Sequence, residues 1–385
     1  MARFVSVPIS QVFAYSNILF LFIGIATSPN LTHKGSKTAK LWFLFYLLYF
    51  TFGFIATAYH DFNAPIMRTI IPVIYFWGFF TFFKNAENVE IYQKLFTGLL
   101  LFSSILTIYL MKINFDIDYG GIHIYKLDRA GGVYGDANNA ALVSILTYIF
   151  VKQIFKPKTK TQKIIKIALY FVIFYSLVLT FSTTGLSVFL IILIVSNQSF
   201  FTRERLFLLF VAGIIGFITI LNLQTITKDM PLTKNQRYKI DNLVNVVTLS
   251  TDKVDNSGRG ELLGAMLEKV YENPFLGNGI DYSVVVRGHN TYIGIWADAG
   301  IFAFLLFVGI LILHYYRMLQ TKEATRSFGL SILIVFSVFM ISLQSILNQP
   351  YLITVFAYLG YLIDRNMKES SVNPIRYHQT KHILK

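Results

Sequence analysis

Cysteine is absent from this 385-residue sequence, and charged side chains make up only 14% of it. Without cysteine the chain can form no disulfide, no thiolate metal site and no thiol nucleophile. Soluble domains carry about 25% charged residues, and the much lower share here excludes an ordinary water-soluble protein. The sequence must therefore be read for membrane segments first.

Apolar residues are what the chain has in abundance: 55% of it is hydrophobic, with 37 phenylalanines and 23 tyrosines. Apolar runs recur along the whole length, each close to the roughly 20 residues that cross a bilayer. They are continuous rather than alternating, which favours helices over a barrel. We predict an all-α fold, a polytopic transmembrane helical bundle of about 11 to 12 spans. The predicted spans are 11–27, 41–59, 66–83, 95–111, 138–155, 164–181, 185–200, 206–224, 290–313, 328–346 and 350–364.

The net charge of +14 follows the membrane topology, so it does not call for a nucleic-acid partner. Lysine and arginine gather in alternate connections, as they do in cytoplasmic loops, and the clearest case is "KQIFKPKTKTQKIIK" at 152–166. This alternation predicts that the loop 225–288 lies outside the cytoplasm. The predicted parts are an N-terminal transmembrane bundle (1–224), a long extracytoplasmic loop forming a lid (225–288), C-terminal transmembrane helices (289–364) and a basic cytoplasmic tail (365–385).

The long loop contains a predicted helix within "NSGRGELLGAMLEKVYENPFLGNG" (256–279). Asn256 or Ser257 can cap it, an apolar stripe at helical spacing follows, and Asn273-Pro274 ends it. One interpretation is a surface helix packed on the bundle. The other is a lid over an active site with Arg259 at the helix start, where a cation opposes the helix dipole and an anionic ligand would explain it.

Polar residues that could bind a substrate or take part in catalysis gather on the predicted outer face. Guanidinium groups can clamp phosphates, and a histidine can exchange a proton near neutral pH. The alternatives are structural: a glycine-rich turn with capping residues at 128–139, an interfacial arginine at 287, and a helix cap at 290. Paired histidines are lacking, so we expect no metal and no cofactor. The candidates are Arg129, Asp136, Asn138, Arg259, Arg287, His289 and Asn290.

The order of these motifs resembles the O-antigen ligase and O-antigen polymerase family. An arginine (Arg259) opens a loop helix, "NPFLGNG" follows at 273–279, then His289-Asn290, and a glycine about ten residues on, Gly300. "RAGGVYGDANNAAL", from Arg129, is similar to an upstream family segment. "FSTTGLSVFL" (181–190) stands where many members carry Ser-Arg-x-G, with a threonine in place of that arginine.

This resemblance implies a metal-independent, inverting glycosyl transfer from a glycan carried on undecaprenyl pyrophosphate. It implies a catalytic role for His289 and Arg259. The substrate-binding residues that it implies are Arg129, Arg287, Asn290, Asn138, Asp136, Thr183 and Thr184. It further implies a bacterial cytoplasmic membrane location with the active site on the outer face, membrane lipid as surroundings, and a chain-length regulator protein as a candidate partner.

Three functions stay open on the sequence. A polymerase joining lipid-linked repeat units into a surface polysaccharide is our first hypothesis. A ligase transferring the glycan to lipid A–core is the alternative, and the two share fold and donor. A polysaccharide-lipid transporter would need ionisable groups deep in the membrane, and Asp298 in the ninth predicted span is the main one.

Overall fold

The computed structural model describes residues 7–27, 36–62, 66–116, 120–122, 126–197, 211, 214, 216–248, 250, 259–344 and 346–372. Within them the chain is all-helical apart from a single two-stranded pair, β1 (Phe115–Asp116) with β2 (Gly121–Ile122). The predicted all-α fold is confirmed.

Ten of the eleven predicted spans coincide with helices; of the span at 206–224 the structure describes only 211, 214 and 216–224. Two short 3₁₀ helices, η1 (Gly132–Tyr134) and η4 (Ile346–Asn348), accompany them. The α-helices are α1 (Val7–Ala26), α2 (Lys37–Tyr59), α3 (Ile66–Phe82), α4 (Ala86–Lys112), α5 (Ala137–Ile154), α6 (Lys160–Leu179), α7 (Thr183–Ser196), α9 (Leu223–Ile226), α10 (Lys234–Val247), α11 (Arg259–Glu272), α12 (Tyr282–Val286), α13 (Thr291–Leu319), α14 (Glu323–Ser342) and α15 (Pro350–Val372).

The protein is a multi-pass membrane protein by the length and hydropathy of its helices. Within the described residues, α2, α4, α6, α13 and α14 are long and apolar enough to cross a bilayer. Shorter apolar helical stretches occupy Gln11–Ala26, Ile70–Phe82 and Thr183–Ser196.

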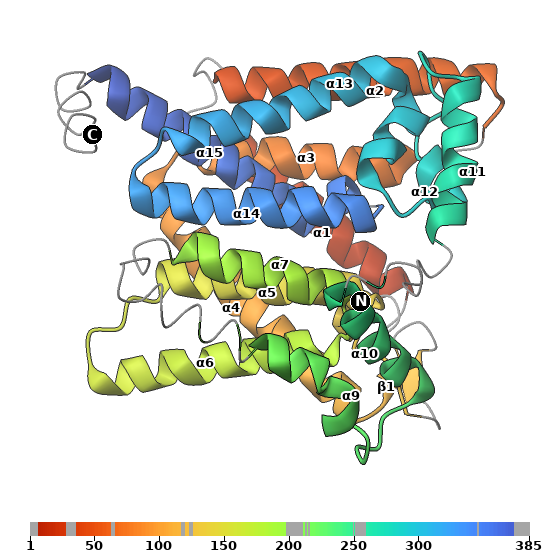
Figure 1. Ribbon diagram of the computed structural model, residues 1–385. Coiled ribbons are helices and arrows are strands. Elements are labelled where there is room, and N and C mark those ends of the chain that lie inside the picture. The colour runs from red at the N-terminus through yellow and green to blue at the C-terminus, as the bar shows by residue number, and fades with distance from the viewer. Residues whose placement is uncertain are drawn as a thin grey trace. The chain divides into compact units, whose positions relative to one another are not determined.

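The chain divides into two compact units. Unit 1 comprises Met1–Pro8, Gln93–Glu261 and Ile334–Ser342, and α5 forms its centre. Almost every α5 side chain from Ala137 to Val151 is buried, and α6 and α7 pack beside it (Figure 1). Hydroxyl pairs join the helices: Ser104 to Thr147 and Ser144 to Ser176, each at 3.1 Å. Such small polar contacts let transmembrane helices approach closely.

Unit 2 comprises Ile9–Tyr92, Leu262–Leu333 and Leu343–Lys385. In it α2 runs beside α13, and α3 beside α15 (Figure 1). The fully buried Trp42 of α2 lies at the centre of an aromatic cluster. Its ring contacts Phe76, Phe307 and Phe356, with centroids 5.0–6.3 Å apart. This packing fixes α2 against the later part of α13, where Phe307 lies.

Helix α13 is broken at Gly300, whose φ of 78° and ψ of 178° are not helical. L-residues with a side chain essentially never adopt that conformation. Residues after the break, 301–319, rise about 28 Å at 1.5 Å each, which nearly spans the roughly 30 Å hydrocarbon core. The first part of α13, from Thr291 to the break, is therefore not needed to cross the bilayer.

We predict that Gly300→Ala destabilises the protein by about 3 kcal/mol or more, because the required backbone conformation is strained and a Cβ has no room. A Cβ at Gly300 would lie 1.9 Å from the carbonyl oxygen of Phe275. Thermal unfolding of the detergent-purified variant measures the loss.

Gly309→Ala is the matched control, because Gly309 lies in the same helix and a Cβ there meets nothing within 4 Å. It should be neutral or stabilise by up to about 1 kcal/mol through helix propensity. Equal unfolding midpoints for the two variants would show that the break is not required.

Candidate functional site

The segment Asn273–Gly279, here called the clasp, takes up the backbone groups that the break in α13 leaves without helical partners. Ile301 N donates to Pro274 O at 2.9 Å, and Asp298 O accepts from Gly279 N at 3.2 Å. Ala297 O accepts from Asn278 N at 2.7 Å. Irregular backbone at membrane depth is tolerated only where the protein supplies such partners. The clasp and the broken helix therefore form one structure.

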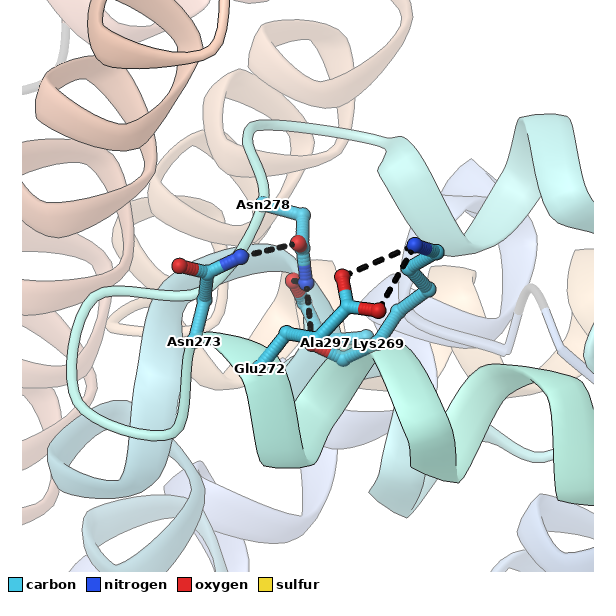
Figure 2. Close-up of polar contacts among 5 residues, drawn as sticks. All are labelled: Lys269, Glu272, Asn273, Asn278 and Ala297. Atoms are coloured by element: carbon cyan, nitrogen blue, oxygen red, sulfur yellow. Dashed lines mark hydrogen bonds and ion pairs between the residues drawn. The ribbon is translucent and has the colours of Figure 1, made fainter.

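Asn278 is the central side chain of the clasp. Its Nδ2 donates to Lys269 O at the end of α11 (3.1 Å) and to Ala297 O of α13 (3.2 Å). Asn273 Nδ2 donates in turn to Asn278 Oδ1 at 2.9 Å. Figure 2 shows Asn278 between these two helices. One side chain thus joins the end of the loop helix to the break.

Gly277 shows why the clasp contains glycine. Its φ is +79°, and a Cβ there would lie 2.7 Å from the backbone of Asp298 and Ala299. Both Gly277 and Gly279 have positive φ. Sequence reasoning missed the contact of this segment with the break in α13. The sequence feature that could have indicated this contact is Gly300, a glycine inside an apolar helix that follows a glycine-rich loop.

Arg287, Gly288 and His289 form a tight turn that enters α13. Arg287 and His289 have φ values of +59° and +49°, and the Gly288 backbone lies against Met266 of α11. Asn290 caps α13, since its Oδ1 accepts from Ile293 N at 3.1 Å. The structural interpretation of Asn290 as a helix cap is thus confirmed. The turn brings Arg287 and His289 to the N-terminal end of α13.

Charge and exposure differ among these residues. Arg287 is exposed, and its guanidinium has no hydrogen bond or ion pair with the described part of the chain. His289 is half-buried. Arg259 begins α11, as predicted, and the proposed caps Asn256 and Ser257 lie outside the described residues. Arg287 thus places an exposed cation at this turn.

The end of α11 carries an exposed ion pair, in which Lys269 Nζ lies 2.8 Å from Glu272 Oε2. The hydrogen bond and charge of Glu272 raise the pKa of Lys269 above its ordinary value. Because both groups are solvated, the pair adds little to stability.

A second group of predicted residues lies in unit 1. Arg129 Nε donates to Thr180 O at 2.9 Å, and its Nη2 lies 3.3 Å from Asn138 Oδ1. Ser182 Oγ donates to the same Asn138 oxygen at 2.8 Å. The segment of Arg129 is therefore docked on the α6–α7 junction, beside the first turn of α7 that holds Thr183 and Thr184.

Two neighbours complete this group. Asp136 caps α5 by accepting from Asn139 N at 2.8 Å, which is the structural role weighed for it. Tyr134 bonds Ser103 at 2.9 Å, and burial raises the pKa of Tyr134 above its ordinary value. The structure thus brings Arg129, Asn138, Ser182 and Thr183 together within unit 1. Arg287, His289 and Asn290 come together within unit 2.

Sequence reasoning also missed a buried polar cluster beneath the start of α13. Asp298, 4% exposed, accepts hydrogen bonds from Tyr49 Oη (2.8 Å), Ser283 N (2.7 Å) and Ser283 Oγ (3.1 Å). Asp298 was noted only as a charge inside a span. It ties α2, α12 and α13 to each other. No group of three or more His, Asp or Glu that could hold a metal is found among the described residues.

We predict that Asn278→Asp lowers the stability by about 3 kcal/mol, because it removes two buried donations and sets a carboxylate against two carbonyl oxygens. The midpoint of thermal unfolding in detergent should fall accordingly.

Glu272→Gln serves as the surface control, since it breaks only the exposed pair with Lys269, and it should change the stability by less than about 1 kcal/mol. If both variants unfold alike, Asn278 does not hold the clasp to α13.

Comparison with known proteins adds the family. Residues 168–308 match a family described as O-antigen ligase. No curated protein matches the chain. The matched stretch includes the α6–α7 junction, α11, the clasp, the Arg287–His289 turn and the break at Gly300. The resemblance of this membrane protein to the O-antigen ligase family is thus confirmed over residues 168–308.

Proposed function

We propose that the chain is a membrane glycosyltransferase that polymerises oligosaccharide repeat units carried on undecaprenyl pyrophosphate into a surface polysaccharide. The observation that carries the proposal is the family match over residues 168–308, which includes the clasp, Arg287 and His289. Family membership supports a polysaccharide-processing enzyme acting on lipid-linked glycans. The more specific assignment of a polymerase activity is our own proposal.

The turn before α13 suits a pyrophosphate leaving group. Arg287 is exposed beside it, and the N-terminal end of a helix favours negative charge. An arginine binds phosphate oxygens bidentately and stabilises charge as the bond to the sugar breaks. Arg259 is our second candidate for this role, because it begins α11 within the same family match.

His289 is proposed as the base. The acceptor hydroxyl attacks the anomeric carbon of the donor sugar, the new glycosidic C–O bond forms, and the C–O bond to pyrophosphate breaks with inversion. The hydroxyl proton passes to His289, whose imidazole can take a proton near neutral pH. The lipid pyrophosphate leaves with the bonding electron pair. Asn290 holds the adjoining helix end in place through its cap.

Arg129 is proposed to bind substrate phosphate or sugar from unit 1, supported by Asn138. Both already share contacts with the α6–α7 junction, which holds the guanidinium in one orientation. Asp136, Thr183 and Thr184 would shape this site. Thr183 stands where many family members carry an arginine, so this chain relies more on its other guanidinium groups.

A ligase that transfers the glycan to lipid A–core is the second candidate, favoured by the description of the matched family as O-antigen ligase. Both activities use the same donor. We propose in either case a bacterial cytoplasmic membrane location with the site on its outer face, under the loop 225–288 as a lid. A chain-length regulator protein would be a partner of the polymerase.

The purified protein, given synthetic undecaprenyl-pyrophosphate repeat unit in detergent with EDTA, should produce a ladder of lengthened glycans on a gel. A ladder supports a polymerase that needs no divalent metal. Release of lipid pyrophosphate only after lipid A–core is added would replace the polymerase by a ligase. If neither product forms, the proposal of a glycosyltransferase is overturned.

His289→Ala should lower the rate of glycan transfer by about 10²- to 10⁴-fold, the usual contribution of a general base. His60→Ala is the matched control, because His60 is an exposed histidine at the end of α2. Single-turnover rates with the same repeat unit measure both. Full activity in His289→Ala would remove this histidine from the chemistry.

A further inference from the structure

A small cavity with a partly polar lining lies in unit 2 beside Asp298, where α2, α12, α13 and η4 meet. Its volume is about 30 Å³, room for about two water molecules or one small ion. None of the residues that line it is a lysine, arginine or histidine. Its polar lining includes Tyr46, Ser283, Thr291, Asp298, Gln344 and Asn348.

A buried acid lines the cavity. The Asp298 carboxylate accepts three hydrogen bonds, which favour its ionised form and oppose the cost of burying it. Asp281, fully buried, adds a second acid next to the cavity, since it accepts from Asn348 Nδ2 at 3.0 Å. A charged carboxylate is costly to bury unless it is paired. A positive occupant would remove that cost.

The lining oxygens present lone pairs. Ser283 Oγ directs its hydrogen to Asp298, and Thr291 Oγ1 directs its hydrogen to Leu343 O at 2.6 Å. Asn348 uses its Nδ2 on Asp281, which leaves its Oδ1 as an acceptor. Oxygen atoms whose hydrogens are already committed elsewhere cannot donate to a guest. They suit a hard cation, which prefers carboxylate, carbonyl and hydroxyl oxygens.

An independent observation also points to an occupant. Tyr46 is 7% exposed and lines the cavity, and its hydroxyl has no hydrogen-bond partner in the described part of the protein. The buried Nε2 of Gln344 lacks one too. Turning the Gln344 amide by 180° would place Oε1 there instead, since the two orientations are nearly indistinguishable in shape.

We propose that this cavity binds one monovalent metal cation, with Na⁺ as the preferred ion. One lining carboxylate matches one positive charge, and the remaining ligands are neutral oxygens. A divalent site would draw on several carboxylates. Asp298 lies two residues before the break, and discontinuous membrane helices are used elsewhere to bind such ions. The ion would join α2, α12, α13 and η4 just below the Arg287–His289 turn.

The test is ion-dependent stability, which does not require glycan transfer and so stands apart from the proposed function. The full-length protein is purified in detergent without alkali ions. Its thermal unfolding is followed in NaCl, KCl, CaCl₂ or choline chloride at constant ionic strength. The unfolding midpoint should rise with the logarithm of Na⁺ concentration above the dissociation constant, and choline should give no rise.

Variants connect the effect to the cavity. Asp298→Asn should abolish the Na⁺-dependent rise. Should that variant not fold, Tyr46→Phe provides the answer, because it removes only a hydroxyl and should raise the half-saturating Na⁺ concentration about tenfold. Tyr92→Phe is its control, since the buried Tyr92 hydroxyl pairs with Thr354 at 3.1 Å and does not line the cavity.

The proposal is overturned if the wild-type midpoint is the same in Na⁺ and choline, or if Asp298→Asn and Tyr46→Phe both retain the full response. Stabilisation by Ca²⁺ alone would replace the monovalent ion by a divalent one. A midpoint that changes with pH but not with Na⁺ would mean that Asp298 holds a proton instead.

Discussion

The structure of unit 2 depends on one interruption of hydrogen bonding, the break of α13 at Gly300. It leaves Ala297 O, Asp298 O and Ile301 N without helical partners, and the clasp satisfies all three. The other features follow from this arrangement. The clasp fixes the end of α11, Asp298 pins α12 through Ser283, and α12 leads directly into the turn that carries Arg287 and His289.

The candidate site residues predicted from the sequence fall into two separate sets, one in each unit, and each set is held by different contacts. Arg129 is held by Asn138 and the carbonyl of Thr180, so its orientation is fixed by unit 1. Arg287 is exposed at a helix start and keeps its charge available. If both bind an anionic ligand, as proposed, they would serve it differently. The half-buried, oriented Arg129 would fix the geometry of the ligand, and the solvated Arg287 would attract its charge.

Much of the fold could be predicted from the sequence because apolar run length is a strong signal in membrane helices. The helix after Arg259, its end at Asn273-Pro274 and the cap at Asn290 were likewise readable from local residue chemistry. The break was not, because Gly300 sits in an apolar run that hydropathy scores as continuous. Nor was the Asp298 cluster, since Tyr49 lies 249 residues away and only tertiary packing joins them.

The clasp has a consequence for biosynthesis. The chain emerges from the ribosome N-terminus first, so residues 273–279 are made before Gly300 is. When the interrupted helix is made, the backbone partners that it needs already exist, only some 20 to 30 residues upstream. A broken helix made in the opposite order would have to insert with bare polar groups. Here the order of translation supplies the partners of the broken helix before the helix itself is made.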